Sequence, residues 1–316
     1  MPWWEVYTED RSLVRIDDGT ARLADKWSED VWSDLEPWWG SYVERQREEA
    51  RELYQYLDRL GELWINSECS FDTDPLTVDW TSDRDIRGPL RPNQEENWSR
   101  WLADVLRTAP DRLGIELFGE AFEGEPTNVR CEEYLPATLS SEPYRYADIL
   151  CIFSRNGISI EVKKGDENYE KTTHTARLIE EKHSRYDWDH FLLLPKKKMY
   201  ALRQSFKDDL EDTADRTILE SGRSGPISVI YWQDISASIR NTLLHGEAPN
   251  QHWEASAYLL CTLIEQKILG YIPQPKVATI STASTVLLTP TLTNVTEGVI
   301  EDQIQYLRKI EVNKDE

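Results

Sequence analysis

"YADILCIFSRNGISIEVKKG" (residues 146–165) contains two short apolar runs on either side of an Asn-Gly pair. Runs rich in Ile, Leu, Val and Phe that flank such a turn signal predict a β-hairpin. Charged residues are unusual in these strands, because a buried charge needs a partner or a ligand. Asp148 stands at the head of the first run, and Glu161 and Lys163 interrupt the second. These three side chains therefore need either solvent or a chemical role.

Strand geometry places the three charges close together. Side chains alternate along a strand, so Glu161 and Lys163 are expected on one face and Val162 on the other. A tight turn at Asn156-Gly157 brings Asp148 alongside Glu161. Two neighbouring carboxylates repel each other unless a cation lies between them, and hard oxygen ligands suit Mg²⁺ or Mn²⁺. The sequence thus predicts a metal site formed by Asp148, Glu161 and the backbone carbonyl of Val162.

The patterns around this hairpin predict a longer series of elements. Apolar residues at helical or alternating spacing indicate, in chain order, a helix, three strands, a helix and a strand. They cover residues 92–110, 127–137, 144–154, 157–165, 168–186 and 187–197. Asn93 is the expected cap of the first helix. A further helix is expected over 198–220, followed by a strand over 225–235 and two helices.

This order of elements, with an acid on one strand and acid-x-Lys on the next, resembles the PD-(D/E)xK nuclease superfamily. The spacing from Asp148 to Glu161 is similar to that of archaeal Holliday-junction resolvases and Mrr-like restriction nucleases. The resemblance covers residues 93–198, about a third of the chain, and Ala147 replaces the family's common Pro. It implies an α/β fold with a restriction-endonuclease-like αβββαβ core and a mixed central sheet. It also implies catalytic roles for Asp148, Glu161 and Lys163, with Mg²⁺ or Mn²⁺ as cofactor.

The resemblance also directs attention to the first helix, because many members of the superfamily add an acid from it. Glu95 and Glu96 occupy that element here, and Glu96 is the preferred candidate. Glu133, in the first strand, is a weaker one. Lys163, beside the metal, is expected to position or deprotonate the attacking water and to stabilise charge in the transition state. The simpler alternative is an edge hairpin whose three charges face solvent.

The charge distribution bears on the kind of partner. The net charge of −22, from 36 basic and 58 acidic residues, argues against nucleic acid, because phosphate binding needs Lys and Arg. The acidity is nevertheless uneven, since residues 148–207 carry 12 basic and 9 acidic residues. The expected phosphate contacts in and beside this region are Lys164, Lys171, His174, Arg177, Lys182, Lys196, Lys197 and Lys198. An acidic, lysine-poor chain also resembles proteins of salt-loving organisms, in which salt screens self-repulsion.

The remaining sequence suggests three regions. Residues 1–90 form a Trp-rich, mainly helical N-terminal region, 91–240 the nuclease-like core, and 241–316 a C-terminal helix with a strand-like extension. The extension is Thr-rich over residues 276–295, and a final polar helix follows it. No apolar run is long enough to span a bilayer, so a soluble, cytoplasmic protein is expected. The four cysteines and five histidines show no metal-binding spacing.

These observations favour a metal-dependent DNA endonuclease. Restriction or other defence against foreign DNA is preferred to recombination, because junction resolvases are usually compact and this chain has about two hundred further residues. The alternatives are a resolvase-type nuclease, a non-catalytic module that retains the fold for DNA or protein contact, and an acidic protein that mimics DNA. DNA is the expected partner, and a homodimer or partner subunits of a defence system remain open.

Overall fold

A computed structural model describes most of the chain from residue 94 onward. The described ranges are 94–137, 144–165, 168–207, 209–213, 216–220, 224–273 and 290–312, together with residues 48, 51–53 and 55–63. Asn93 and most of the Trp-rich N-terminal region lie outside them. In the described helices, none combines the length and the apolar character that a bilayer crossing requires.

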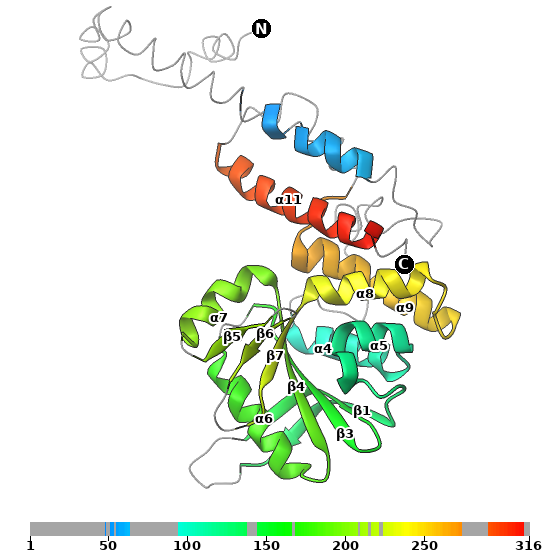
Figure 1. The fold of residues 1–316 in the computed structure, drawn as a ribbon, viewed down its shortest axis with the longest axis vertical. Coiled ribbons are helices and arrows are strands. Elements are labelled where there is room, and N and C mark those ends of the chain that lie inside the picture. The colour runs from blue at the N-terminus through cyan, green and yellow to red at the C-terminus, as the bar shows by residue number, and fades with distance from the viewer. Residues whose placement is uncertain are drawn as a thin grey trace, which may run out of the picture.

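A seven-stranded mixed sheet forms the centre of the fold (Figure 1). Its order is β1-β2-β3-β4-β7-β6-β5, in which β3, β4 and β7 are parallel and all other neighbours are antiparallel. The strands are β1 Asn128–Leu135, β2 Arg145–Ile152, β3 Asn156–Val162, β4 Asp187–Leu194, β5 Leu210–Asp212, β6 Thr217–Leu219 and β7 Ile227–Tyr231. The expected α/β class with a mixed central sheet is confirmed.

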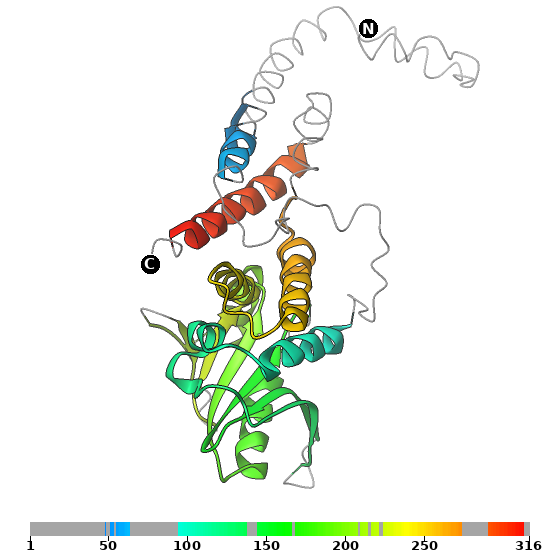
Figure 2. The ribbon, with the colours of Figure 1, turned by 90° about the vertical axis from the view of Figure 1, so that its right-hand side faces the viewer.

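Helices cover both faces of the sheet (Figures 1 and 2). One face carries α4 Glu95–Arg107, α5 Asp111–Phe118, α8 Trp232–Leu244 and α9 Gln251–Leu263, and the other α6 Glu170–Lys182 and α7 Met199–Ser205. Successive side chains of β4 point to opposite faces of the sheet and are apolar on both. Phe191 and Leu193 pack against the first group of helices, and Leu192 and Leu194 against the second. The 3-10 turns η2 Gly119–Ala121 and η3 Lys196–Lys198 follow α5 and β4.

The predicted order of helix, three strands, helix and strand is present between α4 and β4, with α5 as an addition that was not predicted. The cap of α4 is Gln94, which makes no side-chain capping bond. The helix expected over 198–220 ends at Ser205, and β5 and β6 form a hairpin instead. That hairpin extends the sheet because β6 pairs with β7, which buries Leu219.

The turn between β2 and β3 differs from the predicted one. Its central residues are Ser154 and Arg155, because the Phe153 amide donates to the Asn156 carbonyl over 3.0 Å. Gly157 already belongs to β3. A Cβ atom at this position would lie 2.6 Å from the indole ring of Trp188 on β4, so the glycine makes room for that ring.

A second, smaller core joins a helical segment of the N-terminal region to a helix of the C-terminal region. Residues 51–53 and 55–63 are helical and pack through Leu53, Leu57 and Leu60 against α8 and against α11, which spans Pro290–Val312 (Figure 2). Residues 290–295 are thus helical where a strand-like segment was expected, and 274–289 lie outside the described residues. Helix α8 runs across the expected boundary at 240–241 and contributes to both cores.

Candidate active site

Asp148 lies where β2 separates from β3. The last paired residues of the two strands are Ile149 and Ile160. Beyond them, the Asp148 carboxylate accepts a 2.7 Å hydrogen bond from the Val162 amide, in place of a backbone carbonyl. The N–H and C=O of one strand residue point to the same side, so the Val162 carbonyl also faces Asp148. The expected proximity of Asp148 to the end of β3 is confirmed.

Glu161 and Lys163 project from the same face of β3, as alternation predicts. The Lys163 Nζ atom donates to Glu161 Oε1 over 2.9 Å, and the two side chains are only 8% and 12% exposed. Val162 packs on the other face, in the main core. The Lys163 backbone is held at both groups, because its amide donates to the Leu193 carbonyl and its carbonyl accepts from Trp232 Nε1. The ammonium therefore leaves a fixed stretch of backbone.

Burial and charge shift the proton equilibria of this group. Burial, and then the nearby Glu161 carboxylate, raise the pKa of Asp148 well above its usual range, against the hydrogen bond from Val162. Burial by itself lowers the pKa of Lys163, but the carboxylates of Glu161, Asp148 and Glu95 outweigh it and the net shift is upward. Lys163 is thus held as an ammonium. It is suited to stabilising negative charge and poorly suited to removing a proton.

The acid that α4 places beside this group is Glu95, and not Glu96, which was the preferred candidate. Glu95 Oε1 accepts hydrogen bonds from the backbone amides of Lys164 and Gly165, directly after β3. Its charge also contributes to the pKa shifts of Asp148 and Lys163. Glu96 is exposed and lies on the side of α4 that carries Arg100. Consecutive residues of a helix point about 100° apart, so only one of the two can face the sheet.

Glu133, the weaker candidate, belongs to a different cluster. Its carboxylate accepts from Lys182 and lies 3.3 Å from Arg130. Burial alone raises the pKa of Glu133, but the Lys182 ammonium and the Arg130 charge outweigh it, so the net shift is downward. Glu133 is therefore an ionised partner of basic side chains at the edge of the sheet.

The oxygen donors at the end of β3 can be compared with what a cation requires. In the described part of the chain, no group of three or more His, Cys, Asp or Glu side chains is placed to hold a metal ion. This leaves the Asp148 and Glu161 carboxylates and the Val162 carbonyl. Such a set does not fit Zn²⁺, whose protein sites use three or four ligands that include His nitrogen or Cys sulfur. It does fit Mg²⁺ or Mn²⁺, which bind one or two carboxylates and keep several waters.

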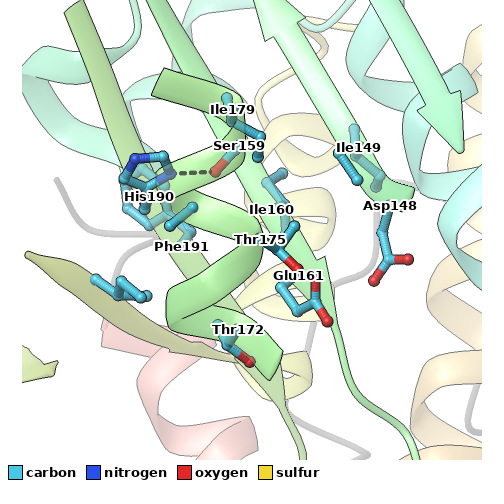
Figure 3. A pocket seen from close by; sticks show the side chains of 13 residues that line it. Asp148, Ile149, Ser159, Ile160, Glu161, Thr172, Thr175, Ile179, His190 and Phe191 are labelled. Atoms are coloured by element: carbon cyan, nitrogen blue, oxygen red, sulfur yellow. Dashed lines mark hydrogen bonds between the residues drawn. The ribbon is translucent and has the colours of Figure 1, made fainter. Parts of the chain in front are cut away.

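A small cleft between the sheet and α6 opens beside the two carboxylates (Figure 3). Asp148 and Glu161 lie at one end of it and His190 at the other. Its polar lining consists of Asp148, Ser159, Glu161, Thr172, Thr175 and His190. The floor and walls are apolar, and include Ile149, Ile160, Ile179 and Phe191. Two carboxylates, three hydroxyls and an imidazole thus line the cleft together with apolar side chains.

Ser159, His190 and Glu180 form a buried hydrogen-bonded chain beside this cleft. Ser159 Oγ and His190 Nδ1 are 2.6 Å apart, and His190 Nε2 lies 3.2 Å from Glu180 Oε1, which also accepts from the Gly225 amide. Burial lowers the pKa of His190. The Ser159 hydroxyl is engaged by His190, so it is already hydrogen-bonded within the protein. These hydrogen bonds connect β3 and β4 to α6 and to the segment before β7.

The expected phosphate contacts are placed unevenly. Arg177 forms an ion pair with Glu181, and Lys182 is engaged by Glu133. The Lys164 ammonium lies 5.2 Å from the centre of the Trp98 ring, and burial lowers its pKa. Lys171 and His174 lie in the first two turns of α6, and Lys196, Lys197 and Lys198 form η3 directly after β4. Because β3 and β4 are parallel, η3 follows the same sheet edge at which Lys163 stands.

Sequence reasoning missed an exposed aromatic cluster near Asp148. Tyr134, Tyr144 and Tyr146 are each at least half exposed, and their ring centroids lie 5.6 to 5.8 Å apart. Tyr134 and Tyr146 face each other across β1 and β2, and Tyr146 is two residues from Asp148. The signal was the Tyr-Arg-Tyr alternation at 144–146 at the head of β2. Contiguous exposed aromatic side chains are typical of contact surfaces.

Comparison with known proteins adds no further assignment: no family model, no curated protein and no solved structure matches this chain.

Proposed function

We propose that this protein is a metal-dependent DNA endonuclease that hydrolyses phosphodiester bonds, with restriction or other defence against foreign DNA as its role. The observation that carries the proposal is the meeting of Asp148, Glu161, Lys163 and Glu95 at the end of β3. They come from α4, β2 and the end of β3, and the Lys163 and Glu161 side chains are only 8% and 12% exposed. Such a cluster opposes folding through repulsion and desolvation, which is typical of residues retained for chemistry.

Each residue of the group has a distinct proposed role. Asp148, Glu161 and the Val162 carbonyl would hold Mg²⁺ or Mn²⁺, which supplies a bound water of lowered pKa and neutralises charge on phosphate oxygens. Lys163 places a fixed positive charge beside Glu161, where it stabilises the negative charge that develops on the phosphate. Glu95 holds the chain that leaves β3 through the Lys164 and Gly165 amides. It thereby orients the strand end that carries Lys163.

Two surfaces near the acids and Lys163 support a nucleic acid substrate. Lys171, His174 and the η3 lysines provide basic groups beside the carboxyl ends of β3 and β4, where phosphates would be held without sequence readout. The cluster of Tyr134, Tyr144 and Tyr146 offers rings on which unpaired bases can stack. A non-catalytic binding module is disfavoured, because it gains nothing from a close group of three acids and a lysine.

The test is cleavage of supercoiled plasmid by the full chain, with Mg²⁺, with Mn²⁺ and with a chelator, at low and high salt. Nicked or linear product that requires the cation, and that disappears in Glu161→Ala, is the expected result. Cleavage that survives both the chelator and the Glu161→Ala substitution would sink the proposal. DNA binding without any cleavage would favour the non-catalytic module.

A pair of neighbouring variants tests the assignment of the helix acid. Glu95→Gln is expected to lower the cleavage rate about 10-fold or more, because the neutral amide accepts weaker hydrogen bonds from the Lys164 and Gly165 amides. Glu96→Gln removes the same charge one residue away on the exposed side of α4, and little change is expected. Single-turnover rates at saturating Mg²⁺ provide the comparison. A greater loss in Glu96→Gln would reverse the assignment.

A further inference from the structure

Two threonines of α6, one turn apart, line the cleft beside Glu161 but differ in their hydrogen bonding (Figure 3). The Thr175 hydroxyl donates to the Lys171 carbonyl over 2.9 Å. The Thr172 side chain is more deeply placed than most polar groups, at 3% exposure, and its Oγ1 has no hydrogen-bond partner within the described structure. The Thr175 hydroxyl is therefore satisfied by its own helix, whereas the buried Thr172 hydroxyl, in a residue that lines the cleft, has no partner among the described residues.

A hydroxyl in this position has an energetic cost. Burying a polar group without a partner costs about 1–3 kcal/mol, and nearly all buried polar atoms in folded proteins are hydrogen-bonded. Valine has the same shape as threonine and a similar helix propensity, and would occupy position 172 without that cost. The Thr172 hydroxyl is thus a candidate to hydrogen-bond a water or ligand in the cleft that Asp148 and Glu161 also line.

We propose that Thr172 Oγ1 accepts a hydrogen bond from a water that stays on the Mg²⁺ or Mn²⁺ held by Asp148 and Glu161. This inference rests on the cation of the proposed function, for which the described residues offer two carboxylates and one carbonyl. Magnesium bound by so few groups keeps several waters, and the protons of those waters need acceptors. Thr172 is then a positioning residue, because it touches neither the cation nor the scissile bond.

The expected loss of Mn²⁺ affinity can be judged from residues that hydrogen-bond to the ligands of metal ions in other proteins. Mutation of such partners typically weakens metal binding 10- to 100-fold. The expectation for Thr172→Val is therefore a loss of about this size in Mn²⁺ affinity. The same substitution removes no protein hydrogen bond, so the melting temperature without metal should be at least that of the wild type. A merely structural threonine would show the opposite pattern, with lower stability and unchanged metal binding.

The experiment measures Mn²⁺ binding by isothermal titration calorimetry on the full chain without DNA, together with thermal unfolding. Thr172→Ser, which keeps the hydroxyl, should bind Mn²⁺ within about 3-fold of the wild type. Thr175→Val is the matched control, since it changes the same chemical group in the same cleft but removes only a bond to the Lys171 carbonyl. Wild-type affinity in Thr172→Val, or equal losses in the Thr172→Val and Thr175→Val variants, would overturn the inference.

The outcomes separate this inference from the proposed function. If the wild type binds Mn²⁺ and shows the expected variant pattern but cleaves no DNA, the nuclease proposal fails and the role of Thr172 stands. If no protein in the series binds Mn²⁺, the cation site fails and the inference fails with it. If Thr172→Val binds Mn²⁺ normally but has a raised KM for DNA, the hydroxyl serves the substrate and the inference is overturned.

Discussion

Lys163→Met is expected to reduce metal-dependent DNA cleavage by a factor of about 10²–10³ or more, the usual effect of removing one charged or hydrogen-bonding group from a transition state. The Lys163 ammonium is buried, lies 2.9 Å from Glu161 and has a raised pKa, so it is a full positive charge in a region of low dielectric. Methionine retains most of the length of the side chain and removes the ammonium with its charge and its hydrogen bond to Glu161. Single-turnover cleavage of a labelled duplex measures the effect.

The control for this substitution is the next residue. Lys164→Met removes the same charge from the same strand end, but that ammonium lies over the ring of Trp98. A change of less than about 10-fold is expected, because one phosphate contact contributes mainly to binding. Fluorescence anisotropy with Ca²⁺ would show whether Lys163→Met still binds DNA. Equal losses of cleavage in the two variants would mean that the site responds to overall charge and not to Lys163 itself.

The largest loss of stability is expected from Glu265→Ala, at a residue outside the candidate active site. Glu265 lies in the π-helical turn η4 (Ile264–Leu269) and is fully buried. Its two carboxylate oxygens pair with Arg240 Nε and Nη2 of α8 at 2.5 and 2.9 Å, and Tyr306 of α11 donates to it over 2.6 Å. The substitution leaves the Arg240 guanidinium buried without its carboxylate, which costs about 3–5 kcal/mol. Urea unfolding of the full chain provides the measurement.

Two further variants serve as controls for the Glu265→Ala substitution. Arg203 and Asp212 also form an ion pair, in which Arg203 Nη2 donates to both carboxylate oxygens, but their side chains are about half exposed. Arg203→Ala should therefore cost no more than about 1 kcal/mol. The double variant Arg240→Met with Glu265→Met removes both charges and should recover much of the loss. If Glu265→Ala destabilises the protein no more than Arg203→Ala does, the network contributes little to holding α11 on α8.

The hairpin and the pairing of its charges were predictable because they depend on short-range rules. The two-residue period of a strand decides that Glu161 and Lys163 share one face, whatever surrounds them. Their contact in the structure confirms it. The series from α4 to β4 was predictable for the same reason, because apolar spacing reports local geometry. The reversal between Asp148 and Glu161 was also correct, although the residues of the turn were not.

The errors concern features that depend on distant packing. The rotation of α4 is set by Trp98, Leu102, Val105 and Leu106 packing on the sheet, and that packing, not the motif, directs Glu95 inward and Glu96 outward. Gly157 looked like a turn residue, yet it is required by Trp188, which lies 31 positions later. The β5–β6 hairpin exists because β7 offers it an edge on which to pair.

The amino-acid sequence alone determined the α/β class, the hairpin, and the meeting of Asp148, Glu161 and Lys163, because these follow from periodicity within a few residues. Only the tertiary structure decided that Glu95 is the helix acid, that Thr172 lines the same cleft, and that Glu265 joins α8 to α11. Each of these depends on contacts between side chains far apart in the chain. Such contacts arise from the packing of whole helices and strands, which no local pattern encodes.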